Sequence, residues 1–347
     1  MIQVKSLCWQ RTFKLCLGAF LLVFCFGFFG CAVKSQNIKP SDNNAQLKEI
    51  EKARALVKSV NDYCREKLGY TVFINYQDYK KSTGIKYLFR ASPKYKLSYD
   101  YSSSAIKSEL FDNEAGAKKM AEELKDSHDT YIYILDGHGG GFPLTDSFFK
   151  LDKTRQILLV AHEDWHDNIN FSYSLEEGTG TLLGYLVAIE ILKDRPQDNN
   201  AFQYAKTILE WSRARAGVII KYYALLESLY KQDVPESAKE LARQEYFREA
   251  EKECRDVSKR FGLNSSITTF NNATFSSWIT YDRYLELAYR VYLGTGKDIA
   301  KTAEIFRGIK PLSKHSIIPG YFMTEEMIKK YEKEQVEYLE KYTEKAK

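Results

Sequence analysis

The chain has 347 residues, 44% of them hydrophobic, and a formal net charge of +5. This length and hydrophobic content allow a substantial buried core, which excludes a disordered protein and leaves room for one large domain or two modest ones. Residues 1–30 carry three basic and no acidic residues, so the rest of the chain has a net charge of only +2, and no nucleic-acid partner is expected.

The first 33 residues have the pattern of an export signal. Three basic residues precede an uncharged stretch of 19 residues, Leu15–Val33, and basic residues before an apolar run keep that end of the chain in the cytoplasm while the remainder crosses the membrane. The run closes on Gly30 and Cys31, which resemble the bacterial lipobox, where a cysteine after a small residue receives the lipid. We expect residues 1–30 to be a signal sequence and Cys31 to be the lipid attachment site, with an uncleaved signal anchor as the alternative.

Residues 31–45 are mostly polar and suit a lipid-anchored tether between the membrane and the folded body. The body is therefore expected in the bacterial cell envelope, in the periplasm or at the outer membrane, facing away from the cytoplasm. The two cysteines beyond this tether are Cys64 and Cys254. An oxidising compartment would permit a disulfide between them, and the sequence leaves open whether they pair.

The amino-terminal half combines helical and strand patterns. Apolar residues at helical spacing predict a helix over 46–68, and Asp112 or Asn113 is placed to cap another helix that ends at Leu124. Segments rich in aromatic and β-branched residues predict strands over 86–90, 96–99 and 130–135. Glycines between residues 136 and 141 break the last of these strands.

The carboxyl-terminal half is almost wholly helical. Helices are predicted over 182–192, 202–230, 235–261, 276–293, 298–309 and 324–345. The last is highly charged and is expected to project from the body. We predict an α+β fold with a small sheet in the amino-terminal half, in which residues 46–160 form the substrate cleft, residues 161–320 form a helical metallopeptidase region, and residues 321–347 form a charged carboxyl-terminal helix.

Residues 162–166 read His-Glu-Asp-Trp-His and match the HExxH pattern. Helical residues four apart lie on one face, so His162 and His166 can bind one ion. Glu163 lies where a carboxylate can take a proton from a metal-bound water. Zinc uses three protein ligands in such sites and lowers the pKa of the bound water to about 7. Chance alone produces HExxH in roughly one chain of this length per hundred, so a third ligand must support the interpretation.

The third ligand has two candidates. Glu176 and Glu177 follow His166 by ten and eleven residues, and a helical hairpin could bring either carboxylate to the two histidines. Ser174 and Glu177 also have the spacing of a capping box, in which the glutamate would bond to the backbone at the start of a helix instead. From the residues alone, Glu177, Glu176 and neither glutamate remain open.

Several blocks within residues 50–310 resemble the gluzincin metallopeptidases, and more closely the bacterial lipoprotein family known as "putative aminopeptidase". The blocks are REKLGY, FDNEAGAKKMAEELK, GFPLTDSFF, LEEGTGT and FNNATFSSWITYDRY. The resemblance implies a zincin-like active-site helix and a peptidase anchored to the membrane. It also implies one Zn²⁺ per chain held by His162, His166 and Glu177, a peptide substrate, and Glu163 as the catalytic base. The substrate-gripping Gly-x-Met-Glu-Asn stretch of some gluzincin aminopeptidases does not occur in this chain.

Three further positions are weaker candidates. Tyr281, singled out mainly by the resemblance, could donate a hydrogen bond to the oxyanion of the transition state. His138 lies among glycines and could approach a substrate carbonyl, or it is an ordinary loop residue. Asp164 or Asp167 could orient a histidine through its second ring nitrogen, or both could lie on a solvated helix face.

Two functions compete at this level. The first is a membrane-anchored zinc metallopeptidase, with aminopeptidase activity as one specificity that it could have. The second is a non-catalytic envelope lipoprotein that acts as a binding or scaffold module, with an empty or purely structural HExxH site. No sequence pattern indicates an oligomeric state.

Overall fold

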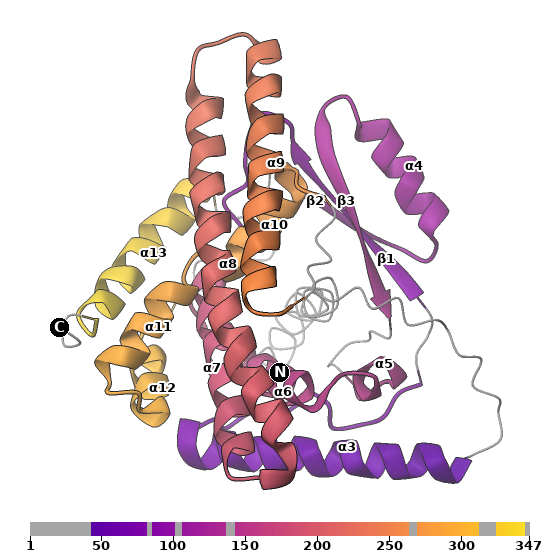
Figure 1. Cartoon of the computed structure of the whole chain (residues 1–347), viewed down its shortest axis with the longest axis vertical. Helices are drawn as coiled ribbons and strands as arrows, with labels where there is room; N and C mark the ends of the chain where they lie inside the picture. The colour runs from indigo at the N-terminus through magenta and orange to yellow at the C-terminus, as the bar shows by residue number, and fades with distance from the viewer. Residues whose placement is uncertain are drawn as a thin grey trace, which may run out of the picture.

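A small antiparallel sheet lies beside a larger group of helices in the computed structural model of the chain (Figure 1). The structure describes residues 43–81, 85–100, 106–136, 143–263, 269–311 and 324–343. The sheet comes from the amino-terminal half and the carboxyl-terminal half is helical, so the predicted α+β class is confirmed.

The sheet has three strands in the order β2-β1-β3. These are β1 (Ile85–Pro93), β2 (Lys107–Phe111) and β3 (His128–Asp136). The predictions over 86–90 and 130–135 are confirmed by β1 and β3, whereas the strand predicted over 96–99 is wrong. Its Ser98 donates its N–H to Ser276 and accepts at its carbonyl from the Tyr223 hydroxyl. Backbone groups that helices use in this way cannot pair with a strand.

One face of the sheet is covered by α4 (Glu114–Leu124), and the other turns toward the helices (Figure 1). Of the two predicted caps, Asn113 begins α4, because its side chain accepts a hydrogen bond from the backbone of Gly116 at 2.9 Å. Phe89 and Ala91 of β1 pack against Ala117 of α4. This contact makes the sheet and α4 one two-layer unit.

The helices follow the predicted order with one division that the sequence did not indicate. They are α3 (Asn43–Tyr63) with the short turn η1 (Cys64–Leu68), α5 (Asp146–Phe149), α6 (Lys153–Asn168), α7 (Tyr173–Lys193), the turn η2 (Pro196–Asp198), α8 (Asn199–Lys231), α9 (Glu236–Arg260), α10 (Asn272–Asp282), α11 (Leu285–Gly294), α12 (Ile299–Arg307) and α13 (Glu325–Glu340). The predicted helix 276–293 is in fact two helices. Arg283 and Tyr284 interrupt it, and their side chains bind the Tyr99 carbonyl and the Glu332 carboxylate.

The last helix, α13, packs on the body instead of projecting from it, which corrects the prediction from charge. Its buried residues are Ile328, Glu332, Gln335 and Leu339. Glu332 accepts hydrogen bonds from the hydroxyls of Tyr99, at 2.6 Å, and Tyr284, at 2.7 Å. The high charge of the helix misleads because one of its carboxylates has buried partners.

Helix α6 runs through the middle of the helical part, with α3, α7 and α8 packed around it (Figure 1). Its residues from Ile157 to Trp165 are all buried. The hydrophobic core includes residues of α3, α6, α7 and α8 together, and position 160, where the predicted regions divide, lies inside α6. A helix buried on every side is held rigidly, and this one carries the HExxH motif.

Two expectations concern the membrane and the redox compartment. The predicted signal, tether and Cys31 lie outside the described residues, which begin at 43, and remain predictions. Within the described part, no helix combines the length and apolar character needed to cross a membrane. Cys64 and Cys254 are both buried and both free, so the structure contains no disulfide between them.

Candidate metal centre

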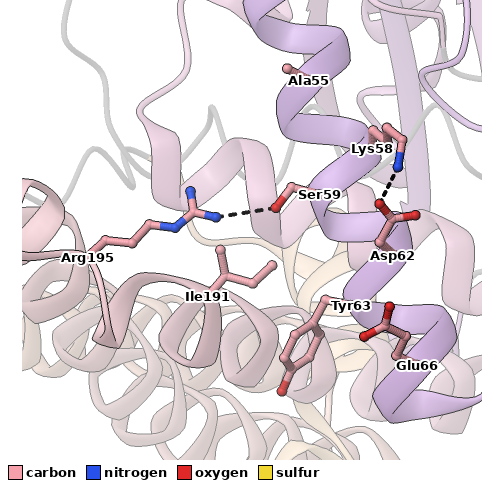
Figure 2. Close-up of a pocket in the computed structure, with 8 residues that line it drawn as sticks. All are labelled: Ala55, Lys58, Ser59, Asp62, Tyr63, Glu66, Ile191 and Arg195. Atoms are coloured by element: carbon pink, nitrogen blue, oxygen red, sulfur yellow. Dashed lines mark hydrogen bonds and ion pairs between the residues drawn. The ribbon is translucent and has the colours of Figure 1, made fainter.

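A shallow surface hollow of about 450 Å³ lies between α3 and the end of α7 (Figure 2). Three of its charged groups have partners, since Lys58 pairs with Asp62 and Arg195 donates to Ser59. Ile191, which lines it, follows Glu177 by fourteen residues on α7, a distance of roughly 20 Å along a helix. The hollow is therefore separate from the HExxH motif, which lies on α6.

Helix α6 is fixed at both ends. Asp152 caps its start by accepting the Arg155 N–H at 3.0 Å, and the helix ends at Asn168. The Asn168 side chain accepts from the backbone of Thr71 and Val72 and donates to the Val72 carbonyl. These bonds tie the end of α6 to the segment after α3, so the helix that carries the two histidines is held at both ends.

The second helix of the hairpin, α7, begins earlier than the capping box requires. Its N-cap is Ser172, and Ser174 lies inside the helix, where its hydroxyl donates to Asp100. The capping-box interpretation of Ser174 and Glu177 is therefore wrong. Glu177 has no backbone group to cap, and its carboxylate turns toward α6.

Glycines allow α7 to approach α6 closely. A Cβ atom at Gly180 would stand 2.9 Å from Cδ1 of Trp165 and 3.3 Å from the His162 ring. A Cβ atom at Gly184 would stand 2.9 Å from the backbone oxygen of Leu158. A larger side chain at either position would push the helices apart, so these glycines set the distance across which Glu177 reaches the histidines.

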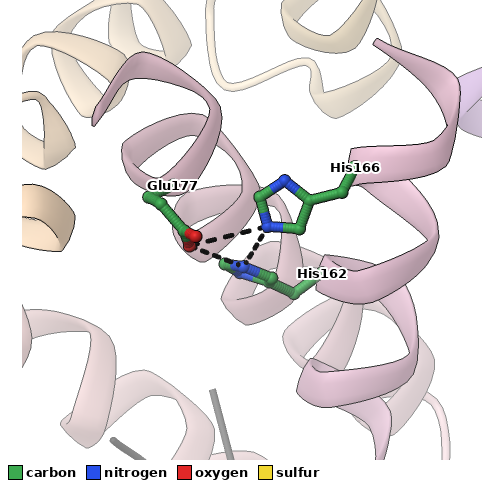
Figure 3. Close-up of side chains that lie close together, drawn as sticks. All are labelled: His162, His166 and Glu177. Atoms are coloured by element: carbon green, nitrogen blue, oxygen red, sulfur yellow. Dashed lines mark hydrogen bonds and ion pairs between the residues drawn. The ribbon is translucent and has the colours of Figure 1, made fainter. Parts of the chain in front are cut away.

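His162, His166 and Glu177 converge across the hairpin (Figure 3). The two Nε2 atoms are 2.9 Å apart, and Oε2 of Glu177 lies 3.1 Å from His162 Nε2 and 3.5 Å from His166 Nε2. The side chains of His162 and Glu177 are buried, while that of His166 keeps 15% exposure. Among the described residues, this is the group of histidine, cysteine and acidic side chains that could hold a metal ion.

The electrostatics of the triad favour a cation at its centre. Burial lowers the pKa of His162, although its hydrogen bond with Glu177 acts to raise it. Burial would also lower the pKa of His166, but Glu177 and Glu176 outweigh it and raise that pKa well above its ordinary value. Burial alone would raise the pKa of Glu177, but the two histidines outweigh it and lower that pKa to about 2. The cluster thus keeps an ionised carboxylate beside a positive charge, and a divalent ion can replace that charge.

Glu176, the other candidate ligand, faces a different nitrogen. Its Oε2 lies 3.5 Å from Nδ1 of His166, and its Oε1 accepts the N–H of Phe171 at 2.9 Å. The carboxylate therefore lies behind the imidazole, on the side away from Glu177. Of the two glutamates left open by the sequence, Glu177 is the one whose oxygen meets both Nε2 atoms.

Glu163 is buried on α6, next to His162. Burial raises the pKa of its carboxyl well above the ordinary value, and the charges of His166 and Glu177 act on it in opposite directions. Its Oε1 has no hydrogen-bond partner within the described part of the chain. A buried polar atom without a partner is costly, so this oxygen is suited to a ligand or a water molecule.

The remaining candidates are placed less directly. Tyr281 is buried on α10, a helix that packs against α7. His138 lies outside the described residues. Both stay predictions.

Asp164 is buried, so the interpretation that it lies on a solvated helix face is wrong. Its carboxylate accepts hydrogen bonds from asparagine amides and not from a histidine. Asn75 donates to Asp164 at 3.0 Å and to Asp167 at 2.8 Å, and the Asn61 amide, with its nitrogen turned inward, donates to Asp164 as well. Burial raises the pKa of Asp164 to about 8, although the Asn75 bond opposes this. The sequence gives no signal for these contacts, because both asparagines are remote from Asp164 in the chain.

Replacing Asn75 with alanine should therefore destabilise the protein by about 1–3 kcal/mol, because the buried Asp164 and the half-buried Asp167 each lose a donor. Urea unfolding of the metal-free protein measures this change. Asp78→Ala serves as the control, since Asp78 lies in the same segment with its side chain exposed. Equal unfolding midpoints for the two variants would contradict the role of Asn75 in holding α6 through Asp164 and Asp167.

Comparisons with known proteins add one match. The family model described as "Putative aminopeptidase" matches residues 35–316, which is most of the chain and includes every residue of the triad. No curated protein and no solved structure matches the chain.

Proposed function

Because this chain belongs to the family described as "Putative aminopeptidase", and so to a family of peptidases, we propose that it is a zinc-dependent metallopeptidase. The observation that carries the proposal is the convergence of His162, His166 and Glu177 across the α6–α7 hairpin. The aminopeptidase specificity in the family name belongs to the same proposal.

The donor set suits zinc in both chemistry and spacing. Zinc in catalytic sites takes imidazole nitrogens and a carboxylate at about 2.0–2.2 Å in tetrahedral geometry, which places neighbouring ligand atoms about 3.3 Å apart. The three separations in the triad are 2.9, 3.1 and 3.5 Å. Three protein ligands leave the fourth position for water or substrate, as a catalytic site requires.

Zinc, when bound, would polarise the carbonyl of the peptide bond and make a water molecule acidic enough to attack it near neutral pH. The chain's own contribution begins with Glu163, which accepts a proton from the attacking water as the new C–O bond forms. Glu163 then gives this proton to the nitrogen of the leaving amine as the C–N bond breaks. The proton gained and the proton lost balance, and the carboxylate returns to its starting state.

Removal of the metal should abolish hydrolysis. We expect the full-length protein, purified without chelators, to contain one zinc ion per chain and to cleave members of a peptide library. A chelator should reduce the cleavage to the level without enzyme, and added zinc should restore it, because the proposed mechanism depends on zinc to polarise the carbonyl and to activate the water. Elemental analysis and sequencing of the products measure both, and the products also show whether cleavage starts at the amino terminus.

Two outcomes would reject the proposal. A wild-type protein without zinc would reject the metal centre. Stoichiometric zinc without turnover of any peptide would favour the non-catalytic envelope lipoprotein.

The proposed place of action is the bacterial cell envelope, with the body held to the membrane through Cys31. This part rests on the basic and apolar pattern of residues 1–33. Labelling of the protein with a lipid precursor, and loss of the label in Cys31→Ser, test it independently of the metal.

A further inference from the structure

Two consecutive glutamates of α7 lie against the two ring nitrogens of one histidine. Oε2 of Glu177 is 3.5 Å from Nε2 of His166, and Oε2 of Glu176 is 3.5 Å from Nδ1. We propose that Glu176 is a positioning residue, which holds the His166 ring with its proton on Nδ1 and so keeps the Nε2 lone pair directed at the metal. This inference rests on the proposed zinc function and adds a role to that site.

The tautomer matters because a neutral imidazole carries one proton and one lone pair. The Nε2 atoms of His162 and His166 face each other and face Glu177, so these are the nitrogens that a shared ion would bind. Binding through Nε2 requires the ring proton to be on Nδ1. A carboxylate on the Nδ1 side accepts that proton in a hydrogen bond, which fixes the tautomer and the ring orientation.

Glu176 is itself held in place. Its Oε1 accepts the backbone N–H of Phe171 at 2.9 Å, in the loop between α6 and α7. This bond occupies one oxygen and leaves Oε2 for the imidazole. The glutamate is also buried, so its carboxylate has little freedom to turn toward water. One side chain thus connects the turn of the hairpin with the orientation of a metal ligand.

The substitution Glu176→Gln separates positioning from a purely structural role. The glutamine oxygen can keep the bond to Phe171, but the amide nitrogen then faces Nδ1 as a donor. Nδ1 must accept, and the ring proton moves to Nε2, where it opposes metal binding. We expect the zinc dissociation constant, measured by competition with a chelator, to rise roughly 10–100-fold. The melting temperature of the metal-free protein should stay near the wild-type value, since the loop bond is retained.

Three comparison variants complete the design. Glu176→Ala loses both bonds, so it should weaken zinc binding and also lower the melting temperature. Glu176→Asp keeps a carboxylate and should bind zinc more tightly than Glu176→Gln. Glu190→Gln makes the same change on the same helix, at a residue paired with Lys193 near the surface, and should leave the dissociation constant unchanged.

Failure of the positioning role and failure of the proposed zinc site would give different results. Wild-type affinity for zinc in Glu176→Gln, or a melting temperature as low as that of Glu176→Ala with unchanged zinc affinity, would overturn the positioning role and leave the zinc site intact. Absence of zinc binding in the wild type would overturn the proposed function together with this inference.

Discussion

Replacing Glu163 with glutamine should abolish peptide hydrolysis and leave the zinc content at one ion per chain. Glutamine has the shape of glutamate but cannot accept the proton of the attacking water. Proton transfer by a positioned side chain contributes about 10²–10⁴-fold to rates, so kcat should fall by at least this factor. Zinc should remain because the triad of His162, His166 and Glu177 does not include Glu163.

The comparison that makes this result specific is His162→Ala. This variant removes one member of the triad and should lose zinc and activity together. Elemental analysis and peptide hydrolysis on both variants separate the base from the ligands. Substantial turnover by Glu163→Gln with zinc bound would reject Glu163 as the base.

The second large effect is expected at the contact between α6 and α7. Gly184→Ala should lower the free energy of unfolding by about 1–3 kcal/mol, because the added Cβ would stand 2.9 Å from the backbone oxygen of Leu158 and the helices must separate. The same separation moves Glu177 away from the histidines, so zinc affinity should fall as well. Urea unfolding of the metal-free protein and chelator competition measure the two effects.

A matched glycine provides the control. Gly217 lies on an exposed face of α8, and a Cβ atom there would meet nothing within 4 Å. Gly217→Ala should stabilise the helix by about 0.5–1 kcal/mol, since alanine loses less backbone freedom on folding than glycine does. The two alanine substitutions are thus expected to have opposite signs. If Gly184→Ala stabilised the protein instead, the contact between α6 and α7 would have space for the added methyl group, and the prediction would be wrong.

Local periodicity predicts most of the helical order in this chain. The histidines of HExxH lie on one helix, α6, as their spacing indicates. The sequence also locates the two candidate glutamates. It could not choose between them, because the choice depends on where α7 begins and on which side each carboxylate meets the His166 ring.

Other features depend on tertiary contacts that no local pattern reports. Strand β2 (KSELF) has mostly exposed residues and little apolar alternation, so its pairing with β1 defines it. The segment 96–99 has the composition of a strand, but hydrogen bonds to α8 and α10 occupy its backbone. At the division between α10 and α11, Arg283 and Tyr284 likewise bind partners that are remote in sequence. The hydrogen bond from Asn75 to Asp164 is another tertiary contact between residues remote in sequence.

The three proposed ligands lie within residues 162–177, on two helices joined by a short turn. Their mutual geometry is therefore set mainly by one hairpin, which Asn168 and Asn75 join to the segment after α3. Segments outside the hairpin could therefore diverge, and with them the choice of peptide, while the proposed metal centre is kept. Selection could in this way alter the substrate of the proposed peptidase without changing the ligands of its metal.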